Sequence, residues 1–425
     1  SSRPVPGWTP ALCYEERNME TRKVNEIEYR EDLYPRFEAN QALIQRYAYS
    51  IEYLPPIKIN QNNILIDGFH RWKAHQLEGV SEIKVEVIQT ASEKELKKLA
   101  YQLNSNHGLQ LSNEEKRKYA IEMIGEMSAQ ALSDILSVDE RTINRWTESQ
   151  RKALDEERNR KILELYLRAW NTQQSIADMF GLTKQAVSEI LSKIGQLSEI
   201  LQDFNPPIYN IWNLQKQDNA TDSHFGSFPL YFMKSLLYYH TEPMDIVFDP
   251  FAGGGTTVDA CKEMLRRYYC TDRSVKPGRE KDILQHDITN GLPDGLPKPD
   301  IVFLDPPYWV LAKKEYSEDE NDLGNMTKEQ FFETMNKLMG EIDERGIKRI
   351  AYVIRPIWET GQENGWLWVD PMFELYEHAK KNYRIEARYV LPYSSQQYTP
   401  LWVDRAKKEN KCLILNRELT VLVRR

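Results

Sequence analysis

Short apolar runs alternate with amphipathic segments along the second half of the chain. Residues 246–248 and 301–304 contain no polar residue, which indicates strands buried on both faces of a parallel sheet. Alternating strands and helices predict an α/β, Rossmann-like domain over residues 206–425. The further strands are expected at 267–271, 350–354, 388–390, 412–415 and 419–423, the last two forming an antiparallel hairpin at one edge of the sheet.

The first 120 residues carry a different pattern. Residues 57–59 and 64–66 are apolar and flank the polar stretch 60–63, which predicts a β-hairpin. A helix that begins after Gly68 and ends near Gly79 follows, and residues 83–88 alternate as a further strand. Residues 1–120 therefore predict a small α+β domain.

Residues 121–205 predict an all-α region. Apolar positions 132, 135, 136, 138, 143 and 146 fit two short helices around a tight turn, a helix-turn-helix. The pattern recurs at 174–191, with Gly181 in the turn and Ala177 where the helices cross, and the charged stretch 151–170 separates the copies. An all-α spacer whose helices pack only on each other is the alternative. The second helices would present Arg141, Asn144, Arg145, Lys184, Gln185 and Ser188 to the base edges of DNA.

Composition narrows the class of protein. A chain of 425 residues is long enough for two or three domains, and its 41% hydrophobic content without an apolar run near 18 residues favours a soluble protein without a membrane span. The start of the chain has no signal-peptide pattern, and four scattered cysteines favour a reduced, cytosolic setting and no metal site. The net charge of −8 means that any contact with DNA must rest on local basic surfaces.

Two motifs follow the two apolar strands, and ligands of open α/β sheets bind at that edge. The first is the glycine-rich stretch 249–257, which lets backbone approach a nucleoside-like ligand and frees amide groups at the start of a helix. The second is Asp305-Pro306-Pro307-Tyr308. A carboxylate beside an aromatic face suits an exocyclic amino group on a flat base, because Asp305 can accept its hydrogen bond while Tyr308 stacks on the ring.

On these two motifs, residues 224–425 resemble an S-adenosylmethionine-dependent DNA amino-methyltransferase of the N6-adenine/N4-cytosine group. The resemblance implies catalytic roles for Asp305, Pro306, Pro307 and Tyr308, with adenine N6 as the leading target and cytosine N4 as the alternative. RNA or a protein glutamine is a third option. The resemblance also implies that S-adenosylmethionine is bound by Phe228, Pro229, Asp249, Pro250, Phe251, Gly253, Gly255, Thr256, Thr257, Asp272 and Asp287. Asp272 and Asp287 could instead only cap helices.

Residues 36–120 resemble the N-terminal domain of ParB-type partition proteins and their sulfiredoxin-fold relatives. The stretch 68–74 stands where that family has its Gly-x-x-Arg-Arg-x-Ala nucleotide motif, which implies a nucleoside triphosphate at Gly68, His70 and Arg71. His70 replaces the first arginine of the motif, and Asn106-His107 stands where the family often has Asn-x-x-Arg. From spacing alone, a structural turn whose arginine pairs with an acid is favoured.

Recognition of the target is expected in the first 200 residues. Only about fifty residues separate the two motifs, and no long insertion is evident there to serve as a target-recognition domain. The expected partners are double-stranded DNA, a nucleoside triphosphate and, as a further candidate, a second copy of the chain. A ParB-like DNA-binding switch that keeps a methylase-like domain for binding only is the competing hypothesis, and the intact Asp305 argues against it.

Overall fold

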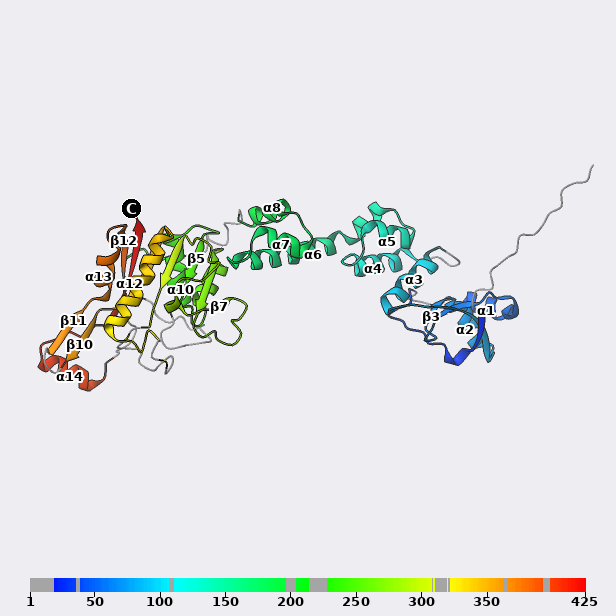
Figure 1. Ribbon diagram of the computed structural model, residues 1–425. Helices are drawn as coiled ribbons and strands as arrows, with labels where there is room; N and C mark the ends of the chain where they lie inside the picture. Colours follow the sequence, from blue (N-terminus) through cyan, green and yellow to red (C-terminus); the bar gives the residue numbers. More distant parts are fainter. Residues whose placement is uncertain are drawn as a thin grey trace, which may run out of the picture. The chain divides into compact units, whose positions relative to one another are not determined.

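The computed structural model describes residues 19–35, 39–106, 111–195, 204–213, 228–307, 309, 319, 322–361, 365–392 and 398–425. The chain divides into two compact units, Ser1–Arg158 and Asn159–Arg425 (Figure 1). Within the described ranges, no helix is long and apolar enough to cross a membrane.

The first unit begins with a four-stranded sheet in the order β1-β4-β2-β3. Strands β2 and β3 form the predicted hairpin, and β4 runs parallel to β2. Ile57, Ile59 and Val85 are fully buried beneath α2, which confirms the predicted α+β architecture. The elements are β1 (Met19–Lys23), η1 (Val24–Glu26), α1 (Gln41–Ala48), η2 (Ile51–Tyr53), β2 (Ile57–Asn60), β3 (Leu65–Asp67), α2 (Phe69–Leu77) and β4 (Glu82–Ile88).

An all-α region follows, made of α3 (Glu93–Asn106), α4 (Asn113–Met123), α5 (Ala129–Leu136) and the first part of α6 (Glu140–Leu167). Ser137 ends α5 in the left-handed conformation, so α5 and α6 meet at a tight turn over the buried Leu132 and Ile143. The charged stretch 151–170 was expected to be helical, and it is helical as far as Leu167, but the expectation of a short second helix separate from it was wrong. A single helix of 28 residues spans both, because no glycine or proline interrupts it.

The second unit contains the other helix pair, α7 (Gln173–Phe180) and α8 (Lys184–Gly195). Gly181 ends α7 with a φ of 63°, which favours glycine, and it occupies the turn as predicted. Ala177 is fully buried with Ile176 and Val187, so the two helices approach closely there.

The main sheet of this unit has seven strands in the order β12-β13-β9-β8-β5-β6-β7. In this sheet, β13 runs opposite to the other six strands. The predicted strand at 412–415 is absent: residues 411–415 precede β13 without ladder pairing, and β12 is the partner in the hairpin. The strands are β5 (Ile246–Asp249), β6 (Arg267–Asp272), β7 (Ile283–Gln285), β8 (Ile301–Leu304), β9 (Arg349–Ile354), β12 (Tyr383–Pro392) and β13 (Asn416–Arg424).

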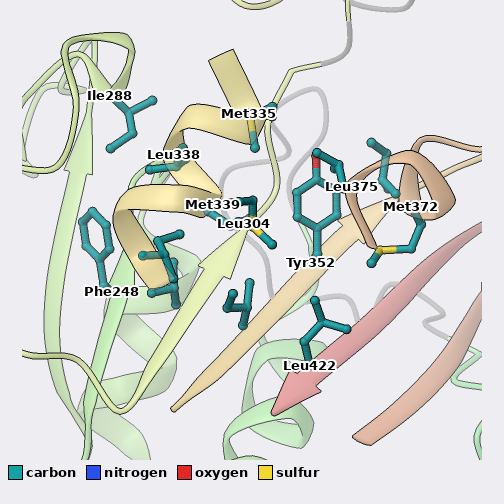
Figure 2. Close-up of a cluster of buried hydrophobic side chains, with 14 of the residues drawn as sticks. Phe248, Ile288, Leu304, Met335, Leu338, Met339, Tyr352, Met372, Leu375 and Leu422 are labelled. Carbon is teal, nitrogen blue, oxygen red and sulfur yellow. The ribbon is translucent and has the colours of Figure 1, made fainter. Parts of the chain in front are cut away.

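Helices cover both faces of this sheet, as a parallel sheet requires. One face packs against α12 (Lys328–Glu344) and α13 (Pro371–Ala379), where Leu304, Met339 and Tyr352 belong to one buried cluster (Figure 2). The other face packs against α10 (Leu230–His240) and α11 (Thr256–Glu263) through a second cluster that includes Phe232 and Val258. This α/β architecture confirms the predicted fold class of the C-terminal domain.

The segment between α6 and α7 belongs to the same unit as the sheet. The Ala169 amide donates to the carbonyl of Tyr268 in β6 at 2.8 Å, and Trp170 makes edge contacts with Tyr268 and Tyr269. Arg168 pairs with Asp282 at 3.0 Å, with both side chains nearly buried. The segment that leads into the second helix pair is therefore packed against the sheet.

Candidate active site

Strands β5 and β8 lie side by side at the point where the direction of the sheet order reverses. From β5 the chain continues outward to β6 and β7, whereas β8 and β9 lie on the other side. Such a switch point leaves a crevice outside the carboxyl ends of the two strands. Asp249 ends β5 and Asp305 directly follows β8, so both predicted motifs flank this crevice.

The glycine-rich turn is shaped by a buried carboxylate. Asp249 is 2% exposed; its carboxylate accepts the Phe251 amide at 2.9 Å and the Thr257 hydroxyl at 2.5 Å. Burial raises the pKa of Asp249 to about 7. Pro250 and Thr257 are buried as well, so these predicted cofactor residues form the inside of the turn.

Gly253 and Gly255 hold the turn open towards the crevice. Their φ angles are 49° and 90°, and Gly255 is the residue that caps the N-terminus of α11. A Cβ atom on Gly255 would lie 3.0 Å from the guanidinium of Arg279, which is fixed by two bonds of 2.7 Å to Asp259. Only glycine fits here without strain.

Asp272 ends β6 beside this turn, as predicted. Its carboxylate accepts the amides of Gly253 at 2.8 Å and Ser274 at 2.9 Å, and burial raises its pKa. A carboxylate offers about four acceptor positions. Two of them hold the two loops together, and further acceptor capacity suits the hydroxyls of a ribose.

Asp287 caps a helix, which is the alternative to cofactor binding that the sequence left open for it. It accepts the amide and hydroxyl of Thr289 at 3.0 and 2.7 Å and so caps the short helix η3 (Ile288–Asn290). Arg273 also contacts it at 3.3 Å and pairs with Asp319 and Asp322. Arg273 was missed from the sequence, where a basic residue after a strand end gives no distinct signal.

Asp305 lies in a largely enclosed position, with its side chain 21% exposed. Burial raises its pKa from 3.8 to about 6, against the opposing effect of Arg417. The Arg417 guanidinium lies 4.0 Å from the Asp305 carboxylate and 4.4 Å from the centre of the Phe228 ring. Arg417 is thus the cation that faces Asp305, and it joins two segments that were predicted to belong to the site.

Arg417 was not among the predicted site residues. It is the second residue of β13, and the antiparallel direction of that strand brings its start to the carboxyl edge of the other strands. The strand wrongly predicted at 412–415 placed residue 417 in a turn, and so the position of Arg417 beside Asp305 was not expected.

The other predicted site residues lie around the same crevice. Pro229, Phe251 and Thr256 are half-buried there, and after Asp305, Pro306 is buried and Pro307 is half-buried. Tyr308 lies outside the described residues.

The glycine turn of the first unit has extensive internal contacts. Gly68 has a φ of 104°, and a Cβ there would lie 2.6 Å from Ile57. Arg71 donates to the Asp67 carboxylate at 2.9 Å and to the carbonyls of Pro55 and Pro56 at 3.1 and 2.7 Å. The buried His70 ring accepts the Asn40 amide at 3.0 Å. These contacts are those of a structural turn, and nucleotide binding there stays a prediction.

The predicted DNA-reading residues lie mostly on the surface. Lys184, Gln185 and Ser188 are exposed on α8. On α6, Arg141 and Arg145 are exposed, whereas Asn144 is half-buried and accepts a hydrogen bond from Arg151.

The site and the sheet thus define a Rossmann-like class of domain with a glycine-rich turn and an Asp-Pro-Pro turn at its switch point. Residues 82–276 match the model of a family described as DNA methylase, N6_N4_Mtase. The match includes the glycine-rich turn and ends before Asp305. It confirms the resemblance to DNA amino-methyltransferases. Among curated proteins, none matches the chain.

Solved structures of two kinds are similar to parts of the chain. ParB of Caulobacter crescentus complexed to the centromeric parS site is 13% identical over 41% of this chain and 99% of that chain, with a TM-score of 0.25. The same protein complexed with CTP-gamma-S is 15% identical over 30% of this chain and 76% of that chain, with a TM-score of 0.20. The Burkholderia thailandensis 1,6-didemethyltoxoflavin-N1-methyltransferase with bound S-adenosylhomocysteine is 12% identical over 46% of this chain and 77% of that chain, with a TM-score of 0.29. Because every TM-score lies below 0.5, the inferences below rest on the residues and on the family match.

Proposed function

We propose that this protein is a DNA methyltransferase that transfers a methyl group from S-adenosylmethionine to N6 of an adenine extruded from double-stranded DNA. The observation that carries the proposal is the position of Asp305, a mostly buried carboxylate at the switch point beside the glycine-rich turn. The family match over residues 82–276 supports the substrate class.

The chemistry that the site must perform is the activation of a poor nucleophile. The lone pair of an exocyclic amino group is delocalised into the ring. In our proposal, Asp305 accepts a hydrogen bond from that nitrogen, which draws it towards tetrahedral geometry, and the negative charge stabilises the positive charge that develops there. Pro306 and Pro307 stiffen the turn that holds the carboxylate in place.

The residues of the crevice fit S-adenosylmethionine. Gly253 and Gly255 would let its nucleoside approach the backbone, and Asp272 would accept hydrogen bonds from its ribose hydroxyls. Phe228, held against Phe232 with ring centres 4.3 Å apart, lies near the Asp305 edge of the crevice, where the methionine end is expected. When bound, the cofactor supplies an electrophilic methyl group on a sulfonium.

Transfer of labelled methyl groups into duplex DNA tests this function. Digestion of the product to nucleosides distinguishes N6-methyladenine, the expected product, from N4-methylcytosine, which would leave the chemistry intact and change the target. Asp305→Ala is the matched control for label that enters by other routes. The absence of label from DNA, with S-adenosylmethionine bound normally, would overturn the proposal in favour of a DNA-binding protein with a methylase-like domain.

A further inference from the structure

Four tryptophans gather on two connections that are far apart in the sequence. Strands β10 (Ile357–Gly361) and β11 (Gly365–Val369) form a hairpin after β9, and α14 (Pro400–Lys408) lies between β12 and β13. Trp358, Trp366 and Trp368 belong to the hairpin and Trp402 to α14. We call these four residues the tryptophan surface. The hairpin and α14 lie together in Figure 1.

Both connections leave the main sheet at its catalytic edge. Strand β13 is antiparallel to β9 and to β12, so β9 and β12 share one direction and end at the same edge. That edge also holds the end of β8, which Asp305 follows. Glu359, from the middle of β10, accepts a hydrogen bond from Trp309 at 3.4 Å and pairs with Lys328 at 3.2 Å. The hairpin is thus connected to the segment that begins with Asp305.

The inner part of the tryptophan surface is fixed by specific contacts. The ring centres of Trp358 and Trp368 are 4.9 Å apart, and those of Trp366 and Trp402 are 5.9 Å apart. The Trp358 indole donates to the Cys412 carbonyl at 2.8 Å, and the Trp366 indole donates to Glu409. The hairpin and α14 are therefore joined into one body.

The outer part is open to solvent. Trp368 is 48% exposed and Trp402 is 38% exposed. Leu401, next to Trp402 at the start of α14, is 78% exposed. Large apolar side chains that are exposed together usually mark a surface that binds another molecule.

Basic residues surround these rings. Arg405 lies 5.4 Å from the Trp366 ring and 5.5 Å from the Trp402 ring, and Lys411 lies 5.2 Å from the Trp358 ring. Residues 400–411 contain four basic and two acidic residues, although the whole chain carries a net charge of −8. One of the two acids, Glu409, is bonded to Arg405 and Trp366. Aromatic rings among cations suit stacked bases and the phosphates between them.

We propose that the tryptophan surface binds the DNA beside the extruded base, with Trp368 and Trp402 stacking on bases and the lysines of residues 407–411 contacting phosphates. This inference rests on the proposed function and adds a DNA contact to the catalytic domain itself. It also supplies an insertion next to the active site that the sequence had not revealed.

The test compares Trp368→Ala, Trp402→Ala and the double variant with the full-length parent. Binding of a fluorescein-labelled duplex is measured by anisotropy, and S-adenosylmethionine binding by calorimetry. Each single change should weaken DNA binding about tenfold, and the double change more, on the scale of lost base stacking. S-adenosylmethionine binding should stay within twofold. Trp368→Phe should retain much of the affinity, because a flat ring remains.

Phe373→Ala is the matched control, since Phe373 is a 63% exposed aromatic on α13 of the same unit and lies outside the tryptophan surface. It should bind DNA like the parent. A double variant that binds and methylates DNA normally would overturn the inference alone and would leave the surface to a protein partner. A parent that binds DNA through Trp368 and Trp402 yet transfers no methyl group would overturn only the proposed function. A parent that does not bind duplex DNA would overturn both.

Discussion

The guanidinium of Arg417 in β13 lies 4.0 Å from the carboxylate of Asp305, which directly follows β8. Burial favours the neutral form of Asp305, whereas Arg417 favours the anion. The balance leaves the pKa of Asp305 at about 6, so the carboxylate is ionised at neutral pH. The proposed chemistry requires that ionised form.

Asp305→Ala should lower the rate of methyl transfer about a hundredfold or more, on the scale of losing one preorganised charge-stabilising group. The effect grows from ground state to transition state, so affinities for S-adenosylmethionine and DNA should stay within a small factor. Asp305→Asn should retain more activity, since its carbonyl oxygen still accepts a hydrogen bond. Single-turnover transfer of labelled methyl groups measures these rates, and a near-normal rate for the alanine variant would place the chemistry elsewhere.

The single-turnover rate should fall as the pH is lowered through about 6, because protonation of Asp305 removes the acceptor and its charge. Arg417→Gln removes the group that lowers this pKa, so the acid limb of the profile should move to higher pH. Asp249 is buried inside the neighbouring glycine-rich turn, and repulsion by Asp305 raises the pKa of Asp249 in the same direction as burial does. Arg417→Lys keeps a positive charge, so its acid limb should lie between those of the parent and of Arg417→Gln. A lower rate with an unmoved limb would indicate that Arg417 only supports the local structure.

Gly255→Ala should weaken S-adenosylmethionine binding and lower the stability of the second unit by about 1–3 kcal/mol, the range for a strained backbone position. The reason is its φ of 90° together with the contact with Arg279. Gly278→Ala is the control, because Gly278 has a φ of 85° but no atom near the position of a Cβ. Calorimetry and thermal unfolding should show a larger effect for Gly255. Equal effects would mean that the contact with Arg279 does not matter.

A fragment of residues 159–425 should be more stable than one of residues 206–425. The shorter fragment removes the carbonyls of Tyr166, Ala169 and Asn171, which accept hydrogen bonds from the Arg267 guanidinium at 2.9–3.2 Å. Hydrogen bonds to a charged group contribute about 1.5–3 kcal/mol each. Thermal unfolding measures the difference, and equal melting temperatures would contradict it.

We also expect the longer fragment to prefer particular DNA sequences and the shorter one to lose that preference. The longer fragment retains Lys184, Gln185 and Ser188 on α8. Binding to a pool of random duplexes, followed by sequencing, compares the two fragments. Undiminished selectivity in residues 206–425 would assign recognition to the catalytic domain, for instance through its tryptophan surface.

Arg71→Ala should abolish nucleotide binding by the first unit while methylation of short duplexes stays largely intact. Because Arg71 also holds Asp67 and two proline carbonyls, the variant should lose about 1–3 kcal/mol of stability. Calorimetry with each nucleoside triphosphate is the measurement, with a melting curve to show that the variant is folded. If the parent binds none of them, the turn has only a structural role.

The sequence predicted those parts of the molecule in which local pattern and burial agree. The runs 246–248 and 301–304 lie in central strands, where every residue except Ile246 is buried, and Gly181 lies in a turn that favours a positive φ. The sequence misled at 412–415, where apolar residues suggested a strand. Ile414 is buried there by packing alone, without ladder pairing. Apolar character indicates burial and does not by itself establish strand pairing.

Two of the features that were missed depend on long-range pairing. Arg417 reaches Asp305 only because β13 runs against its neighbours. The tryptophan surface combines residues 358–368 with residue 402, and no local period relates them. Trp358 and Trp368 face each other across the hairpin, a pairing that depends on the register of β10 and β11.

The alternation of side chains along β13 has a consequence for the charge beside Asp305. Arg417 is followed by Glu418, and a strand that slides by one residue turns every side chain to the opposite face. A slip of β13 along β9 that brought Glu418 to the position of Arg417 would therefore exchange the cation beside Asp305 for an anion. Leu419 to Val423 are buried on both faces and discriminate weakly between the two registers. At the far end of the strand, Arg424 is bonded to the Asp343 carbonyl at 2.7 Å and pairs with its carboxylate at 3.1 Å. This anchor, a whole strand length from the crevice, helps to fix the sign of the charge that Asp305 meets.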